Sequence, residues 1–528
     1  MDYSKHFNPS ATPQNQPIPG KIMVPNSGGG YSFEIDKWKR LDRFLILGSD
    51  DGTFYVKEKE LTIENAKNVL DCIAEDGVMV AARAREVSIK GKAYKVNPVL
   101  FTMALVCAKG NERARNAAYF CIPEICRIGT HLFQFCHYVN SIKGWSRGLR
   151  NSVSRFYLEK SPDDLAYQIV KYRQRLGWTH RDVLRLAHPK AKDPAINMIL
   201  HFAVKDEYNP EITPKIIQAY SYLKHEDDKK KAVEIIKANR LPRECIPTHF
   251  LKEKEVWEAL LISMPLTALI RSLGPMTSYG VFPHDLDGNV QVACHKLTDE
   301  SYLKKSRVHP IQILIALKTY SEGKGEKGKL TWTPNRKIME ALDQAFYKTF
   351  ENVIPTGKRI MICLDVSGSM SWETSRLCGT SLTAAEGAAA LCLVTARTEA
   401  HYMIVPFSDK WMPLQISDKM MLKDVINELE KIQMGNTDCA VPILEAIKNK
   451  MMVDAFIVYT DSETNCGPIH PVQALAQYRK KFNQNAKLIV VGMTSSGFSI
   501  ADPYDQGMMD VVGFDPSVPA VISDFIRE

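Results

Sequence analysis

The sequence lacks the patterns that mark membrane and secreted proteins. No stretch of its 528 residues approaches the roughly 18 uninterrupted apolar residues of a membrane span, and the longest apolar runs, such as LIVVGM, have the length of a strand. Residues 1–30 are rich in Pro, Gly, Ser and Asn and contain no apolar core of a signal peptide. We therefore expect a cytoplasmic protein with no membrane partner, in which residues 1–36 form a flexible tail.

Zinc-binding patterns are also missing. The chain has 12 cysteines, but no two form a CxxC pair and no Cys/His spacing is typical of a zinc site. Most of the cysteines lie inside apolar segments such as FCIPEIC and LCLV. We therefore expect reduced, buried thiols.

The net charge of +8 is unevenly distributed along the chain. Residues 1–350 carry 53 Lys and Arg against 39 Asp and Glu, whereas residues 351–528 carry 15 against 21. Within the first part, residues 101–200 carry 16 basic against 7 acidic side chains. A basic front and an acidic back indicate two bodies with different tasks, and nucleic acid is the first candidate partner of the basic one.

The basic part shows almost no alternating β pattern. From residue 60 to about residue 350, apolar residues recur at helical spacing, as in NPVLFTMALVCAKG and VWEALLISMPLTALIRSL, and caps or breakers such as Ser161-Pro162 separate the segments. Many short helices of this kind fit the stacked helix pairs of an α-solenoid. The sequence shows no clean repeat period.

The pattern changes near residue 355. Four apolar strand candidates, at 359–365, 401–407, 454–460 and 487–493, alternate with helical stretches. Buried strands that alternate with helices predict a doubly wound parallel sheet of the α/β class. Functional sites of such sheets lie at the carboxyl ends of the strands.

Three oxygen-rich segments fall at those strand ends. Asp365-Val366-Ser367-Gly368-Ser369 follows the first strand, Gly435-Asn436-Thr437-Asp438 comes before the third, and Asp461 follows the third. Carboxylates and hydroxyls without His or thiolate suit Mg²⁺ rather than Zn²⁺. The first segment alone would be equally typical of a turn or a helix N-cap, and the other two strengthen the metal hypothesis.

A second candidate site is the basic segment 143–190. It interleaves Arg and Lys with Trp145, Tyr157, Tyr172 and Trp178, a mixture that can contact phosphates and stack on unpaired bases. If the segment is helical throughout, Lys171 and Arg175 are four residues apart and share a helix face. The alternative is a solvated helix face whose aromatic side chains belong to the core.

Several stretches resemble a known family. KYRQRLGWTHRDVLRLAH resembles the signature of the TROVE domain of Ro ribonucleoproteins, and other similar stretches run in order from about residue 38 to residue 525. The pattern Asp-x-Ser-x-Ser, Thr, Asp resembles the metal-ion-dependent adhesion site of von Willebrand A domains. These similar stretches include EICRIGTHLFQF, HPIQILIALKTY, PTGKRIMICLDVSGSM, FIVYTDSET and AKLIVVGMTSSGFSIADPYDQGMMDVVGFD.

The resemblance implies a fold and a function. It implies a ring-like α-solenoid of HEAT-like helix pairs at 37–354, closed by a von Willebrand A-like domain at 355–528. Such a protein is expected to be a monomer and not an enzyme. It would bind Y-type small RNA on an outer basic surface and the single-stranded 3′ end of misfolded non-coding RNA in a central hole, for RNA quality control and stability, with an exoribonuclease as a further partner.

Site residues follow from the same resemblance. Those implied to contact RNA are Lys171, Arg175 and His188, with Arg147 and Arg150 in the less similar GWSRGLR stretch. Those implied to hold Mg²⁺ are Asp365, Ser367, Ser369, Thr437 and Asp461. Without the resemblance, His188 would be an ordinary residue at a helix end.

Two other functions are open to the sequence. A Mg²⁺-dependent protein-adhesion module would capture a carboxylate of a partner, although the basic front half argues against adhesion as the whole function. A nuclease or other metal hydrolase is less supported, because the sequence offers one Mg²⁺ site without a second metal cluster or a nearby general base.

Overall fold

The computed structural model describes most of the chain. It covers residues 11–527 apart from residues 35, 48–65, 94–95, 307, 309, 325–328, 351–353, 372–382, 413, 415, 432–434, 463, 494–497 and 513–516. Among these described residues, no helix is long and apolar enough to cross a membrane. The described cysteines are free thiols, and all but Cys294 and Cys466 are buried, as the sequence predicts.

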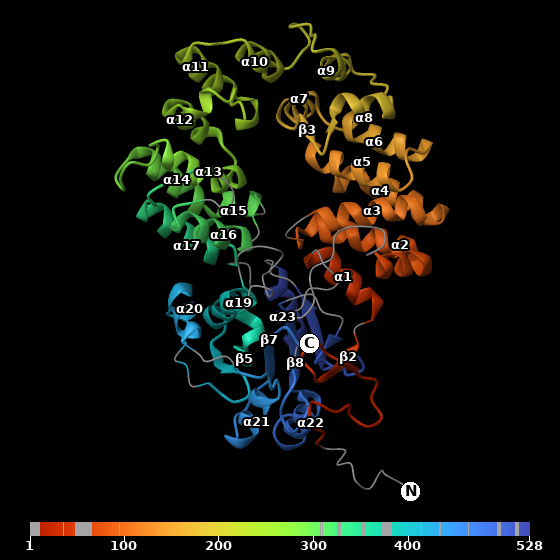
Figure 1. Cartoon of the computed structure of the whole chain (residues 1–528), viewed down its shortest axis with the longest axis vertical. Helices are drawn as coiled ribbons and strands as arrows, with labels where there is room; N and C mark the ends of the chain where they lie inside the picture. The colour runs from red at the N-terminus through yellow and green to blue at the C-terminus, as the bar shows by residue number, and fades with distance from the viewer. Residues whose placement is uncertain are drawn as a thin grey trace.

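Helices dominate the first two thirds of the chain. Figure 1 shows α1 to α17 following one another in an arc whose two ends both meet a domain built on a sheet, so that arc and domain form a ring. The helices of the arc are α1 (Lys37–Leu47), α2 (Lys67–Lys90), α3 (Asn97–Lys109), α4 (Glu112–Ile125), α5 (Gly129–Ile142), α6 (Arg147–Leu158), α7 (Pro162–Lys171), α8 (His180–Ala187), α9 (Pro194–Lys205), α10 (Lys215–Lys224), α11 (Lys229–Asn239), η2 (Arg243–Cys245), η3 (Phe250–Lys252), α12 (Lys254–Ser263), α13 (Leu266–Ser278), α14 (Gly288–Thr298), α15 (Glu300–Ser306), α16 (Pro310–Ser321) and α17 (Arg336–Lys348).

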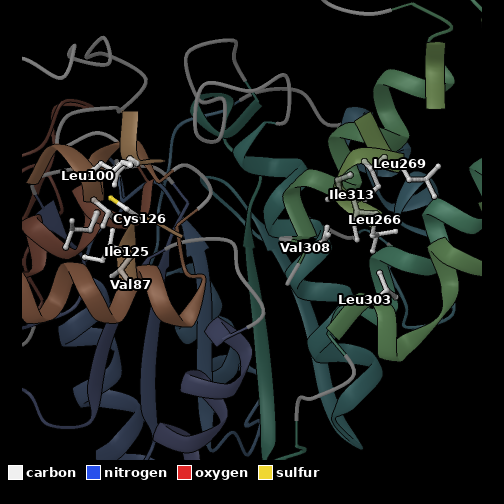
Figure 2. Close-up of a cluster of buried hydrophobic side chains, with 14 of the residues drawn as sticks. Val87, Leu100, Ile125, Cys126, Leu266, Leu269, Leu303, Val308 and Ile313 are labelled. Carbon is white, nitrogen blue, oxygen red and sulfur yellow. The ribbon is translucent and has the colours of Figure 1, made fainter. Parts of the chain in front are cut away.

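Side-chain caps fix where many of these helices begin. The Ser146 hydroxyl accepts the Leu149 amide at the start of α6, and Thr179 and Asp182 form a reciprocal capping box at the start of α8. Figure 2 shows the apolar faces of the helices packed in two groups, with Leu100 and Ile125 in one arm of the arc and Leu269 in the other. Each arm of the arc is therefore stabilised by its own buried side chains.

The sheet domain has the predicted parallel architecture. Its five strands run in the order β10-β8-β7-β5-β6, and every neighbouring pair is parallel. Alternate residues of β5 enter two cores, with Ile362 on the face covered by α19 and Cys363 on the face covered by α21 and α22. The elements are β5 (Arg359–Asp365), α18 (Gly368–Ser371), α19 (Ala384–Thr398), β6 (His401–Phe407), α20 (Leu422–Glu430), α21 (Val441–Lys448), β7 (Ala455–Thr460), α22 (Pro471–Lys481), β8 (Lys487–Gly492), β10 (Met508–Val512) and α23 (Ser517–Arg527).

Residues 11–34 correct one prediction. The sequence predicts a flexible tail over 1–36, but this part of it is packed on the sheet domain through β1 (Val24–Pro25) and β2 (Tyr31–Glu34). β2 pairs in antiparallel fashion with β1 on one side and with β9 (Phe498–Ser499) on the other. A flexible tail is therefore wrong for residues 11–34, because the buried polar groups of Thr12, Gln14 and Asn26 hydrogen-bond to the sheet domain.

Contacts on both sides close the ring. On one side, Arg43 of α1 donates to both carboxylate oxygens of Asp510 on β10 at 2.9 Å, and both side chains are buried. On the other side, the Lys318 ammonium lies 2.8 Å from the Glu386 carboxylate, which joins α16 to α19. The Tyr347 hydroxyl of α17 also accepts the Leu422 amide at 2.9 Å.

Removing the buried partner is expected to be costly. An Arg43→Ala variant leaves the Asp510 carboxylate buried without its cation, which is expected to cost roughly 3–5 kcal/mol. The half-exposed pair of Arg83 with Asp42 on the neighbouring helices supplies the control, since Arg83→Ala is expected to cost about 1 kcal/mol or less. Urea unfolding midpoints of the two variants measure the difference, and equal midpoints would contradict this role of Arg43.

Candidate nucleic-acid interface and metal site

The basic segment does not form one continuous helix. α7 ends at Lys171, and the next residues form a short hairpin of β3 (Gln174–Arg175) and β4 (Trp178–Thr179). The hairpin turn is Leu176-Gly177, and both residues have positive φ (50° and 78°), as a two-residue turn of type I′ requires. The prediction that Lys171 and Arg175 share a helix face is therefore wrong.

Three of the residues predicted to contact RNA, Arg147, Arg150 and Arg175, lie in the helix that begins just after Trp145 or in the hairpin that carries Trp178. Trp178, opposite Arg175 in the hairpin, lies with its ring 6.1 Å from that of Trp145. Trp145 comes just before α6, whose exposed first turn carries Arg147 and Arg150. The structure thus places these three exposed arginines around one pair of half-buried indoles.

His188 lies beside the same helix. It is the exposed C-cap of α8 in the left-handed conformation, with φ of 50°. The Ser154 hydroxyl, one turn after Arg150 on α6, is within hydrogen-bond distance of the Ala187 carbonyl (3.2 Å). The side chain of His188 therefore projects from the end of α8 that packs on α6.

Lys171 has a different environment from the arginines. Its ammonium lies over the rings of Tyr167 and Tyr172, at 5.1 and 5.2 Å from their centroids, and donates to the Tyr167 hydroxyl at 3.1 Å. Burial lowers the pKa of Lys171, but the hydrogen bond to Tyr167 and the charges of Tyr172, Tyr167 and Glu244 together raise it by more, so the net shift of the pKa is upward. Lys171 therefore stays charged in a half-buried site.

Two other residues of the segment belong to the core. Tyr157 is fully buried, and its hydroxyl lies 3.0 Å from Nδ1 of the buried His180. Burial lowers the pKa of His180 to about 4, so this imidazole is neutral near pH 7. The alternative that the aromatic side chains serve as core is thus correct for Tyr157.

A cavity of about 790 Å³ brings further cations to the region. It is lined by Tyr167 of α7 and by residues of α11, α12, α14 and α15. Figure 1 shows α7 on one arm of the arc and the other four helices on the opposite arm. Lys237 and Arg240 line it with exposed side chains, and neither forms an ion pair with a described residue. Lys296 has a structural task, because its ammonium donates to the Leu261 and Ile262 carbonyls at 2.7 Å near the end of α12.

Sequence reasoning missed the cavity cations. The segment KKKAVEIIKANR, at 229–240, is strongly basic but contains no aromatic residue. The aromatic residues that line the same cavity, Tyr167 and Tyr302, come from distant parts of the chain. The run of basic residues at 229–240 was the one sign of this site in the sequence. The cavity that Lys237 and Arg240 line becomes visible only in the folded arc.

The predicted metal ligands meet at the carboxyl end of the sheet. Asp365 ends β5, and its Oδ1 accepts the Ser367 hydroxyl at 2.5 Å, while the Ser367 and Ser369 hydroxyls lie 3.2 Å apart. The Thr460 hydroxyl at the end of β7 donates to Asp365 Oδ2 at 2.6 Å, and Asp461 follows directly.

Thr437 is held from two sides. Its amide donates to Asn465 Oδ1 at 3.0 Å, and its carbonyl accepts the Asn465 amide at 3.0 Å, which joins it to the loop after β7. The amide of the next residue, Asp438, donates to the Ser408 carbonyl after β6 at 2.8 Å. All five predicted ligands therefore lie at one edge of the sheet, at the end of β5 or in the segments that follow β5, β6 and β7.

The electrostatics of this edge fit a divalent cation. Asp365 and Asp461 are both about 1% exposed. Burial, followed by the charge of Asp461, raises the pKa of Asp365 well above its usual range. Two buried carboxylates with hydroxyls around them form a hard oxygen set that suits Mg²⁺.

Comparison with known proteins finds similarity along nearly the whole chain. The TROVE domain family matches residues 24–242 and 240–319, and the Ro60 vWA domain family matches residues 359–526. A Caenorhabditis elegans protein named RNA-binding protein RO60 is 35% identical over 96% of this chain and 90% of its own length. A protein of the same name in Deinococcus radiodurans is 36% identical over 99% of this chain and 98% of its own length. The crystal structure of the Deinococcus radiodurans Ro (Rsr) protein aligns with a TM-score of 0.73 at 37% identity, over 93% of this chain and 99% of that one.

Mg²⁺ is expected to stabilise the sheet domain. A cation between Asp365 and Asp461 relieves their repulsion, and binding at a hundred times the dissociation constant adds about 2.7 kcal/mol to the free energy of unfolding. The gain in stability is the difference between thermal unfolding in Mg²⁺ and in EDTA, measured for the wild type, Asp365→Asn and the exposed control Asp424→Asn. We expect the wild type and the control to gain stability and Asp365→Asn to gain none; an equal gain in all three would place the cation elsewhere.

Proposed function

Because this chain belongs to the Ro60 family of RNA-binding proteins, we propose that it is a non-catalytic RNA-binding protein with two RNA sites. A structured small RNA of the Y type binds the exposed basic surface around α6, α8 and the β3–β4 hairpin. The single-stranded 3′ end of a misfolded non-coding RNA enters the cavity between the arms of the arc. The protein thereby serves RNA quality control and stability.

One observation carries this proposal. The arc and the sheet domain form a closed ring, and exposed cations lie both on the α6 to α8 region and in the cavity between the arms of the arc. Cations that have no carboxylate partner are available to phosphates, and their binding releases counterions from the RNA. Two such groups on one ring support two modes of RNA binding rather than one.

The outer surface suits a folded RNA. Arg147, Arg150, Arg175 and His188 are exposed and come from three neighbouring elements, so they present charge over a surface rather than in a narrow groove. Double-stranded RNA is recognised mainly by its shape and by contacts to phosphates and 2′-hydroxyls. This surface is therefore expected to tolerate many sequences.

The cavity suits an unpaired strand. Lys237 and Arg240 supply phosphate contacts, and Tyr167 and Tyr302 supply aromatic rings. Stacking of bases on aromatic side chains depends little on sequence, as a site for RNA ends of many kinds requires. Lys171 links the two regions, because it donates to the hydroxyl of Tyr167.

We also propose that the sheet domain holds Mg²⁺ through Asp365, Ser367, Ser369, Thr437 and Asp461. Mg²⁺ dehydrates reluctantly and keeps part of its shell as water or an incoming carboxylate. The second candidate function, capture of a protein partner by this site, is favoured by its place on the acidic domain, away from the basic arc. The two functions are compatible in one molecule.

The two RNA sites are expected to respond differently to substitution. In a salt-titrated binding assay with an RNA duplex that carries or lacks a single-stranded 3′ tail, Lys171→Ala/Arg175→Ala/His188→Ala weakens the binding of both RNAs. Lys237→Ala/Arg240→Ala weakens the binding of the tailed RNA alone. Removal of one phosphate-binding cation makes the slope of log K against log salt shallower by about 0.7–0.9.

Lys230→Ala/Lys231→Ala is the matched control for the cavity variant. It removes the same charge from exposed positions of the same helix, α11, and neither residue lines the cavity. Equal affinity for tailed and blunt RNA in every variant would refute the cavity site. Unchanged binding of the blunt duplex in the triple variant would refute the outer site.

A further inference from the structure

The segment 11–34 lies across the loops that carry two of the proposed metal ligands. We call it the N-terminal strap. The backbone N–H of Gln14 donates to the Gly467 carbonyl at 3.1 Å. The backbone carbonyl of Gln14 accepts the Tyr31 N–H at 2.9 Å, which holds the two halves of the strap together. The strap therefore lies against the loop that begins at Asp461.

The side chain of Gln14 is fully buried between two ligand-bearing loops. Its amide nitrogen donates to the Asp438 carboxylate and, at 2.8 Å, to the Ile469 carbonyl. Its amide oxygen accepts the Thr464 hydroxyl. Asp438 directly follows the ligand Thr437, and Thr464 lies three residues after the ligand Asp461, so one side chain bridges both loops.

The second half of the strap holds the same loop. Asn26 Nδ2 donates to the Thr464 carbonyl at 2.6 Å, and the Ser32 hydroxyl lies 3.4 Å from the Ser462 carbonyl. A Cβ atom on Gly30 would collide with the Thr464 carbonyl, so the backbone of the strap touches the loop directly.

Ser462 shows why this loop needs support. It follows Asp461 and adopts a positive φ of 65°, a conformation that side-chain-bearing residues rarely take. Such a backbone persists only where the surrounding structure holds it. The contacts of Ser32 with Ser462 and of Asn26 with Thr464 supply part of that hold.

We propose that Gln14 is a positioning residue for the divalent cation and that the N-terminal strap fixes the separation of Thr437 and Asp461. Groups that orient metal ligands without touching the metal typically change its affinity 10- to 100-fold when they are removed. The inference rests on the proposed Mg²⁺ site. It also makes the metal site depend on a segment that leads directly into α1 of the ring.

Calorimetric titration of the full chain with MgCl₂ tests the proposal. The variants are Gln14→Ala and the matched control Gln16→Ala, whose side chain is exposed on the same strap. We expect Gln14→Ala to raise the dissociation constant about tenfold or more at unchanged stoichiometry, and Gln16→Ala to match the wild type. A purely structural role would lower the stoichiometry, as the folded fraction falls, and leave the dissociation constant unchanged; that result would overturn the proposal.

A second variant covers the case in which Gln14→Ala does not fold. Gly30→Ala pushes on the Thr464 carbonyl from the other half of the strap and is expected to weaken Mg²⁺ binding in the same way. An unchanged dissociation constant in Gly30→Ala would then overturn the proposal. A wild type that binds no Mg²⁺ would remove the metal site itself, whereas a wild type that binds Mg²⁺ only as tightly as Gln14→Ala would remove the role of the strap alone.

Discussion

The buried ion pair between Arg43 and Asp510 is the constraint on which the closed ring depends. Helices of the arc contact mainly their neighbours in sequence, so the position of each arm is set by what holds its end. One end is held by a charge pair that excludes water, and Ser499 also donates to Asp510 at 2.6 Å. In such surroundings each charge is costly to bury without the other, so loss of either partner is expected to weaken this joint. The cavity has lining residues from both arms, so its width depends on where the two arms are held.

The path of the chain joins the sites mechanically. Residues 11–34 begin on the sheet domain, α1 to α17 lead around the ring, and the chain returns to the sheet domain at β5. The segment that supports the metal loops therefore continues into the helix that carries Arg43. The proposed cation site at the sheet edge and the basic surfaces of the arc therefore lie on one continuous scaffold.

Much of the sheet domain could be predicted from the sequence, because long apolar runs and the polar residues that end them are local signals. The segments 359–365 and 401–407 are β5 and β6, and Asp365 lies at the predicted edge. The fifth strand, β10, was missed because its run MMDVV is interrupted by Asp510. That charge is buried only because Arg43 arrives from a distant helix, which no local pattern reveals.

The errors elsewhere have the same origin. Composition predicted a flexible tail because Gln14 and Asn26 are polar, yet partners more than 400 residues away satisfy both side chains. The assumption of a continuous helix placed Lys171 and Arg175 on one face, but α7 ends at Lys171 and a hairpin with a Leu176-Gly177 turn follows. The cations Lys237 and Arg240 share their cavity with Tyr167 and Tyr302, which lie about 70 residues before and about 60 residues after them in the sequence, so no local pattern indicates the cavity.

The central claim is that an unpaired RNA end lies between the arms of the ring. Photocrosslinking tests it most directly, with a single 4-thiouridine at the 3′ end of a tailed RNA duplex and mass spectrometry to locate the adduct. If the 3′ end enters the cavity, adducts form on its lining, at Tyr167, Tyr302 or the residues next to Lys237 and Arg240. Adducts confined to α6, α8 and the β3–β4 hairpin would contradict it, because the free end would then lie on the outer surface.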